Sequence, residues 1–149
     1  MQLKLTNKDL LTLKTILEKL HISNMRINRG KIKLYKHVLA KIDEYAQDER
    51  DILSAAAVID DDGSFAKNND GNVILKEGET YEHVNNQLNE LSQEEVVLDA
   101  GEYEARYTVF WEWLAECEEE LTMDEVTLVD DLLEQFEKQK ENNYGFRNN

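Results

Sequence analysis

A long apolar stripe without proline most constrains how this chain can fold. Apolar residues recur every three or four positions between Leu34 and Ile59, and only Glu49 interrupts them. That spacing places them on one face of a helix. Proline, the strongest helix breaker, is absent from all 149 residues. The pattern therefore predicts a helix that begins near Lys31 and runs for roughly 28 residues, or about 42 Å.

Shorter stretches with the same period predict four further helices. Thr6 with Asp9, and Thr122 with Glu125, have the spacing of capping boxes, in which each side chain binds the backbone N–H of the other. Thr80 is a candidate cap for a third helix. The predicted apolar faces lie within residues 10–20, 81–91, 103–121 and 126–136.

These patterns predict a mainly α-helical single domain, a bundle of about five helices with a small β-hairpin or ordered loop inserted after the long second helix. The segment 21–30 contains Asn and Gly and predicts a loop, and residues 96–98 fit either a strand or an extended linker. No internal repeat is evident. The expected organisation is a domain over 1–141, made of a basic-to-neutral helical hairpin (1–60), the hairpin or loop (61–79) and acidic helices (80–141), followed by a flexible tail (142–149).

The stretch DDDGSFAKNNDGNVILKEGE, residues 60–79, has some features of a calcium-binding EF-hand loop. With Gly71 at the sixth position, suitable oxygen ligands fall at the third, fifth and twelfth positions, but Ala66 occupies the first and carries no side-chain oxygen. Asp-Gly pairs also suit tight turns, because glycine accepts a positive φ. We therefore predict a hairpin that pairs residues 64–67 with 72–76, and no metal site.

Charge is distributed very unevenly along the chain. Residues 1–41 hold ten Lys or Arg against Asp9 and Glu18, whereas residues 42–149 hold seven against thirty Asp or Glu. The two parts carry +8 and −23, which gives the net charge of −15. Candidate phosphate-binding residues in the basic part are Arg26, Arg29, Lys31, Lys33 and Lys36. The favoured interpretation is that these cations face acidic residues of the same chain or of a neighbour, because a polyanion would be repelled by the whole protein.

The acidic part contains a candidate partner-binding surface. Its expected members are Glu116, Glu118, Glu119, Glu120, Asp124, Asp130, Asp131 and the neighbouring Trp113. On two successive helices, such carboxylates would form a broad negative surface that imitates a phosphate backbone and speeds association with a basic protein. The alternative is a solvated face that keeps the protein in solution. Trp113 lies off the apolar stripe of its helix, which fits either a partner surface, where tryptophan is enriched, or a second packing contact.

The sequence offers little support for catalysis. Its three histidines, His21, His37 and His83, are far apart, and Cys117 lies among carboxylates that disfavour a reactive thiolate. We predict no catalytic, cofactor-binding or metal-binding residue and a protein that is not an enzyme. The chain has no apolar run near the ~18 residues of a membrane span and no signal-peptide pattern, and a single cysteine suits a reducing compartment.

Four segments together carry a resemblance to a known family: LTNKDLLTL (5–13), RGKIKLYKHVLAKIDEY (29–45), EEVVLDAGEY (94–103) and DEVTLVDDLLEQFE (124–137). In that order they resemble uncharacterised proteins of about 150 residues from phages and prophages of Gram-positive bacteria, a domain of unknown function. The resemblance implies a phage-encoded protein in the cytoplasm of an infected bacterial cell. It supplies no site residues.

Three functional hypotheses follow. The first is a non-enzymatic phage accessory protein that binds a host protein through its acidic surface and inhibits a host defence or nucleic-acid-processing protein. The second is a structural or assembly factor of the phage tail or lysis module. The third, disfavoured by the net charge, is direct nucleic-acid binding through residues 26–41. No cofactor and no membrane partner are expected, and homo-oligomerisation stays open.

Overall fold

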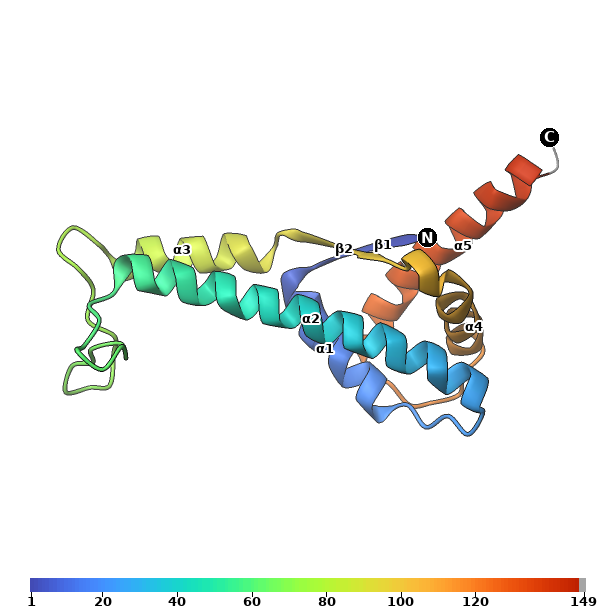
Figure 1. Cartoon of the computed structure of the whole chain (residues 1–149), viewed down its shortest axis with the longest axis horizontal. Coiled ribbons are helices and arrows are strands. Elements are labelled where there is room, and N and C mark those ends of the chain that lie inside the picture. The colour runs from blue at the N-terminus through green and yellow to red at the C-terminus, as the bar shows by residue number, and fades with distance from the viewer. Residues whose placement is uncertain (148–149) are drawn as a thin grey trace. The chain divides into compact units, whose positions relative to one another are not determined.

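The computed structural model describes residues 1–147, the last five of them as backbone only. In chain order, the elements of this part are β1 (Gln2–Thr6), α1 (Asn7–Lys19), α2 (Met25–Ala56), α3 (Tyr81–Ser92), β2 (Glu95–Asp99), the short 3-10 helix η1 (Gly101–Tyr103), α4 (Glu104–Ala115) and α5 (Met123–Arg147) (Figure 1). The predicted fold class is confirmed: the structure is mainly helical, with five α-helices in the described residues and a long second helix.

The chain forms two compact units, and α2 runs through both. The first unit contains Met1–Ile42 and the residues from Glu95 onward, and the second contains Asp43–Glu94.

The first unit contains a two-stranded antiparallel sheet that pairs the N-terminal strand with β2. Leu3 lies opposite Leu98, and Leu5 lies opposite Val96. All four side chains are buried, whereas the intervening Lys4 is exposed, so one face of the sheet covers the core. The strand alternative for residues 96–98 is confirmed. β1 was not predicted, although the alternation in QLKLT is the ordinary signal for a half-buried strand.

Helix α5 covers the free edge of β1 with glutamine side chains. Gln135 accepts from the backbone N–H of Lys4 at 2.7 Å and donates to its carbonyl oxygen at 2.7 Å. Gln139 makes the same pair of hydrogen bonds with Gln2. A side-chain amide has the donor and acceptor of a peptide group, so the two glutamines replace a third strand at this edge.

The start of α2 differs from the prediction. The helix begins at Met25 and not near Lys31, because Asn24 caps it: the Asn24 Oδ1 accepts from the N–H of Ile27 at 3.3 Å, and its carbonyl accepts from Asn28 at 3.0 Å. The predicted loop over residues 21–30 is therefore wrong from Met25 onward. Gly30 lies inside the helix, where it permits a close approach of α4.

The other predicted helix boundaries of the first unit are partly right. Both capping boxes form, since Thr6 donates to Asp9 and Thr122 exchanges hydrogen bonds with Glu125. α4 ends at Ala115, so the acidic segment 116–120 follows the helix and does not belong to it, which corrects the expectation of acidic residues on two successive helices. The largest fully buried side chains of the core are Trp111, Tyr107 and Phe110.

The C-terminal end of the last helix also differs from the expected tail. α5 continues to Arg147, through most of the segment 142–149 that lacks an apolar period. Residues 148 and 149 lie outside the described part of the chain.

In the second unit, residues 57–80 contain an eight-residue repeat that the sequence reading missed. The three copies are AVIDDDGS, FAKNNDGN and VILKEGET. In the structure, equivalent residues make equivalent hydrogen bonds. Val58 N–H donates to the Ile74 carbonyl, Ile74 N–H to Ala66, and Ala66 N–H to Val58, which closes a ring of three bonds of 2.8–2.9 Å. We call residues 57–80 the triple-turn segment (Figure 1, between α2 and α3).

Each copy of the repeat ends in a tight turn. The turns are closed by backbone bonds from Gly63 to Asp60, from Gly71 to Asn68, and, in the last copy, between the N–H of residue 79 and the carbonyl of residue 76. Gly63 and Gly71 adopt φ values of 85° and 82°, which glycine accepts without steric cost. The predicted pairing of residues 64–67 with 72–76 is present as one of three equivalent hairpin contacts, the other two of which were not foreseen.

The Asn68 side chain, a calcium ligand in the EF-hand alignment, has another use in the middle turn. Its Oδ1 accepts from the backbone N–H groups of Asp70 and Asn72, at 2.9 and 3.0 Å. This geometry is that of an Asx-turn, in which a short polar side chain replaces a backbone acceptor. Asn68 therefore stabilises the turn itself.

Candidate functional site

The candidate phosphate-binding residues divide into two groups on α2. Arg26, Arg29, Lys33 and Lys36 follow a spacing of three and four and share one helical face. Lys31 lies on another face, where its ammonium group donates to the carbonyl oxygen of Leu20 at 3.1 Å. The structure therefore brings four of the five cations together in the first unit.

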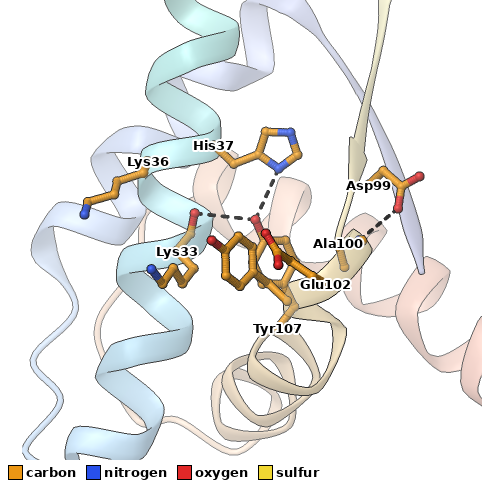
Figure 2. Close-up of a pocket in the computed structure, with 9 residues that line it drawn as sticks. Lys33, Lys36, His37, Asp99, Ala100, Glu102 and Tyr107 are labelled. Carbon is orange, nitrogen blue, oxygen red and sulfur yellow. Dashed lines mark hydrogen bonds between the residues drawn. The ribbon is translucent and has the colours of Figure 1, made fainter.

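Two of these cations, Lys33 and Lys36, open onto a cleft of about 430 Å³ in the first unit (Figure 2). The cleft lies between α2 and the region where β2 passes through η1 into α4. The residues that line it are Lys33, Lys36, His37, Asp99, Ala100, Gly101, Glu102, Tyr103 and Tyr107.

The α2 wall of the cleft is held by two tyrosines. The Lys33 ammonium lies 5.0 Å from the centre of the Tyr103 ring, a cation–π contact. The Tyr107 hydroxyl lies 3.2 Å from His37 Nδ1 and 3.4 Å from the carbonyl oxygen of Lys33, as Figure 2 shows. These contacts fix one turn of α2 against α4.

The opposite wall carries carboxylates. Asp99 Oδ2 accepts from the Gln2 side chain at 3.2 Å, and its Oδ1 accepts from the N–H of Gly101 at 3.0 Å. The hydrogen bond from Gln2, followed by that from Gly101, lowers the pKa of Asp99. Glu102 is exposed at the same wall. Basic and acidic residues thus line the cleft from different elements, Lys33 and Lys36 from α2 and Asp99 and Glu102 from the end of β2 and η1.

Tyr107 is a poor candidate for acid–base chemistry. Burial, with a smaller contribution from Tyr103, raises the pKa of the Tyr107 phenol to about 12. A general base needs a pKa near the working pH, and a phenol that remains protonated at neutral pH cannot serve as one. The arrangement suits the positioning of His37 and α2.

The predicted acidic surface is divided by the structure. Glu116, Glu118 and Glu120 follow α4 and are exposed. Glu119 is half-buried, and its carboxylate accepts from the backbone N–H of His21 at 3.1 Å. Trp113 is half-buried against the core and stacks on the Phe110 ring, with the ring planes 26° apart. The structure thus separates Trp113 from the exposed carboxylates.

Asp124 and Asp131 lie together on α5. With Lys8, Asp9 and Thr12 of α1, and with Thr127 and Leu128, they line a second cleft of about 470 Å³. Asp130 points to a different face of α5.

Asp130 begins a row of carboxylates that the sequence reading did not define. Glu134, Glu137 and Glu141 follow it at steps of four, three and four residues, and all four side chains are exposed. Steps of this size keep residues on one helical face. The spacing in the sequence was the available signal. The apolar period of this helix does not include these acidic residues, which follow a helical period of their own.

Ion pairs join the basic and acidic parts of the first unit. Lys19 pairs with the buried Glu125, Lys4 lies 3.9 Å from Glu95, and the Met1 amino group lies 2.6 Å from Glu104. The cations of these three pairs lie outside the candidate phosphate-binding residues of α2, so the interpretation that those residues face acidic groups stays a prediction. An exposed pair such as Lys4–Glu95 contributes about 0–1 kcal/mol and acts mainly on orientation.

Among the described residues, no helix is long and apolar enough to cross a membrane. A family model described as "Protein of unknown function (DUF1617)" matches residues 1–143. No curated protein and no solved structure matches significantly. The family match covers almost the whole chain, so the expected membership of a family of unknown function is confirmed. The chain belongs to this family of proteins of unknown function.

Proposed function

We propose that the protein is a phage-encoded, non-enzymatic accessory protein that binds a host protein through an acidic surface. Its target is a nucleic-acid-binding protein of host defence or nucleic-acid processing, and the protein occupies the target's nucleic-acid groove. The observation that carries this proposal is the row of exposed carboxylates on α5, formed by Asp130, Glu134, Glu137 and Glu141.

The charge density of the row supports imitation of a nucleic acid. Residues 130 and 141 are separated by about 16 Å along the helix axis, so the row places one carboxylate about every 5 Å. One strand of duplex DNA carries a phosphate about every 3.4 Å of axis. A groove that binds phosphates with lysine and arginine would meet a similar line of anions on α5.

The charge of the rest of the molecule favours binding to a basic protein and disfavours direct contact with nucleic acid. The net charge is −15, which repels polyanions and accelerates association with basic partners. In the first unit, part of the positive charge is also committed to internal ion pairs with Glu95, Glu104 and Glu125. The phage context comes from the sequence resemblance.

The test is affinity capture with the intact protein from a lysate of a Gram-positive host. We expect capture of a DNA- or RNA-binding protein that is released by added duplex DNA and by raising the salt from about 0.05 M to about 0.5 M, because salt screens exposed charges. A variant with Glu134→Gln, Glu137→Gln and Glu141→Gln should lose this capture.

The matched control neutralises three exposed carboxylates of the second unit, through Glu82→Gln, Glu90→Gln and Glu94→Gln. It changes the net charge equally and should retain capture. If both triple variants retain the partner, or if the complex is indifferent to salt, the α5 row is not the binding surface.

A further inference from the structure

The triple-turn segment, which belongs to the second unit, presents a small apolar patch. This patch shares no residue with the row of carboxylates on α5. Val58, Ala66 and Ile74 occupy equivalent places in the three repeats, and the ring of hydrogen bonds sets each opposite the other two. Residues opposite one another in antiparallel pairs point to the same face. Val58 and Ile74 are 38% and 39% exposed, whereas Ala66 is buried beside them.

The backbone beneath the patch has no free edge. The N–H and carbonyl groups of Val58, Ala66 and Ile74 are all used in the ring. A partner therefore cannot add a strand here and must make contact through side chains. The Tyr81 hydroxyl also donates to the Val73 carbonyl at 2.5 Å, which ties the segment to the start of α3. A surface already ordered in this way loses little conformational entropy on binding.

The segment that carries the patch is acidic. The triple-turn segment holds six Asp or Glu and two Lys, a net charge of −4, within a unit (Asp43–Glu94) that holds fourteen acidic and three basic residues, a net charge of −11. An apolar centre with a polar rim is the usual composition of a protein interface. The negative charge of the segment favours a positively charged partner and opposes the approach of a second copy of the same unit.

We propose that the triple-turn segment is a second docking surface, which takes a lysine- or arginine-rich protein segment whose apolar side chain packs between Val58 and Ile74. The surface belongs to the second unit. It does not rest on the proposed role of α5, and either proposal can fail alone.

The test uses the intact protein labelled with ¹⁵N on glycine only, which gives separate reporters in both units. The chain has six glycines, of which Gly63, Gly71 and Gly78 lie in the triple-turn segment and Gly30 and Gly101 lie in the first unit. The probe is a synthetic peptide of alternating lysine and leucine. We expect its addition to move the signals of the three triple-turn glycines and to leave those of Gly30 and Gly101 in place.

Two matched variants test the apolar centre. Val58→Ser with Ile74→Ser keeps the charge and should weaken peptide binding about tenfold or more, because two half-exposed apolar side chains lose their contact. Leu11→Ser with Ile32→Ser removes exposed apolar side chains of the first unit and should leave affinity unchanged. An unchanged dispersion of the glycine signals shows that the variants remain folded.

Three results would overturn the proposal. A peptide of lysine alone that binds as tightly shows attraction by charge without an apolar site. Signal changes that spread to Gly101 and Gly30 show that the peptide coats the whole acidic protein. Movement of the triple-turn signals with protein concentration, in the absence of peptide, shows that a second copy covers the patch.

Discussion

Gly30 of α2 lies against the carbonyl oxygen of Arg106 in α4, so closely that a Cβ on Gly30 would come within 2.3 Å of that oxygen. The neighbouring Phe110 Cβ would be 3.1 Å away. Backbone atoms of a packed helix cannot rotate out of the way as a side chain does. The absence of a side chain at Gly30 is thus what sets the distance between α2 and α4 at this point.

Gly30→Ala should destabilise the protein by about 1–3 kcal/mol, the usual cost of forcing extra atoms into a packed contact. Denaturation in urea measures the change. The sign of the change in the free energy of unfolding distinguishes the two cases, because in an exposed helix the same substitution stabilises the protein by about 1 kcal/mol. Ala40→Gly at an exposed position of α2 is the control and should cost about 1 kcal/mol through helix propensity alone. A stabilised Gly30→Ala variant would contradict the close approach.

Glu125→Gln should lower stability by about 1–3 kcal/mol, because the buried carboxylate loses its charge-assisted bond with Lys19. That bond, with those from Thr122, holds the pKa of Glu125 below its ordinary value of 4.5. The stabilisation is therefore fully present above pH 4.5 and is lost as the pH falls through the lowered value.

Urea denaturation between pH 7 and about pH 3 checks this prediction. The Glu125→Gln variant should show a smaller loss of stability across the acidic range than the parent protein. Glu134→Gln, at an exposed position of the same helix, should leave the pH profile unchanged. Equal pH profiles for the parent and the Glu125→Gln variant would show that Lys19 does not stabilise the charged carboxylate.

Tyr107 should ionise above the ordinary range of a tyrosine. Its pKa of about 12, against an ordinary 10.0, means that the unfolded state releases the proton first, so stability falls as the pH rises from 10 to 12. Phenolate absorbance in the folded protein should show a late step near pH 12. Tyr107→Phe should remove that step and cost about 1 kcal/mol through the lost hydrogen bonds. Tyr81→Phe, at an exposed tyrosine, should leave the late step in place.

Gln135→Ala should cost about 1–2 kcal/mol, because it leaves the N–H and carbonyl groups of Lys4 without their partner at the sheet edge. Hydrogen exchange of the Lys4 amide should accelerate. Glu134→Ala on the neighbouring exposed position serves as the control, with a change within about 0.5 kcal/mol. If Lys4 exchange is unchanged, water replaces the glutamine at no cost.

Gly71→Val should loosen the whole triple-turn segment. The substitution strains only the middle turn, since φ is 82° and no atom lies within 4 Å of an added Cβ. Because the three hydrogen bonds form a closed ring, amide exchange should accelerate at Val58, Ala66 and Ile74 together. Gly71→Asn, which tolerates positive φ better, should have a smaller effect. Faster exchange confined to the middle turn would show that the repeats open separately.

The helices were predictable because apolar spacing and capping residues act over a few positions. Thr6, Thr80 and Thr122 each precede a helix in the structure. The start of α2 was misread because Gly30 looks like a helix breaker, whereas its position reflects a contact with Arg106, 76 residues later in the chain. No local pattern reports a contact of that kind.

The strand β1 and the eight-residue repeat were not predicted from the sequence, for different reasons. The alternation in QLKLT indicates a strand, but no local pattern identifies its distant partner, residues 95–99. The equivalent contacts of the eight-residue repeat are backbone hydrogen bonds, so its three copies have few side chains in common. For the candidate site, the row on α5 required the knowledge that the helix continues past Glu137. The cleft at Tyr107 could not be predicted from the sequence, because the residues that line it come from two distant segments, 33–37 and 99–107.

The ring of the triple-turn segment also brings its two ends together, since the N–H of Lys76 donates to the carbonyl of Ala56, the last residue of α2, at 2.8 Å. The chain therefore leaves α2 and returns to it at almost the same place, so that residues 57–75 form a separate insertion. We expect that a short turn in place of residues 57–75 would leave Ala56 and Lys76 at the spacing they already have. A change in the length of this segment would therefore not require a change in the helices α2 and α3.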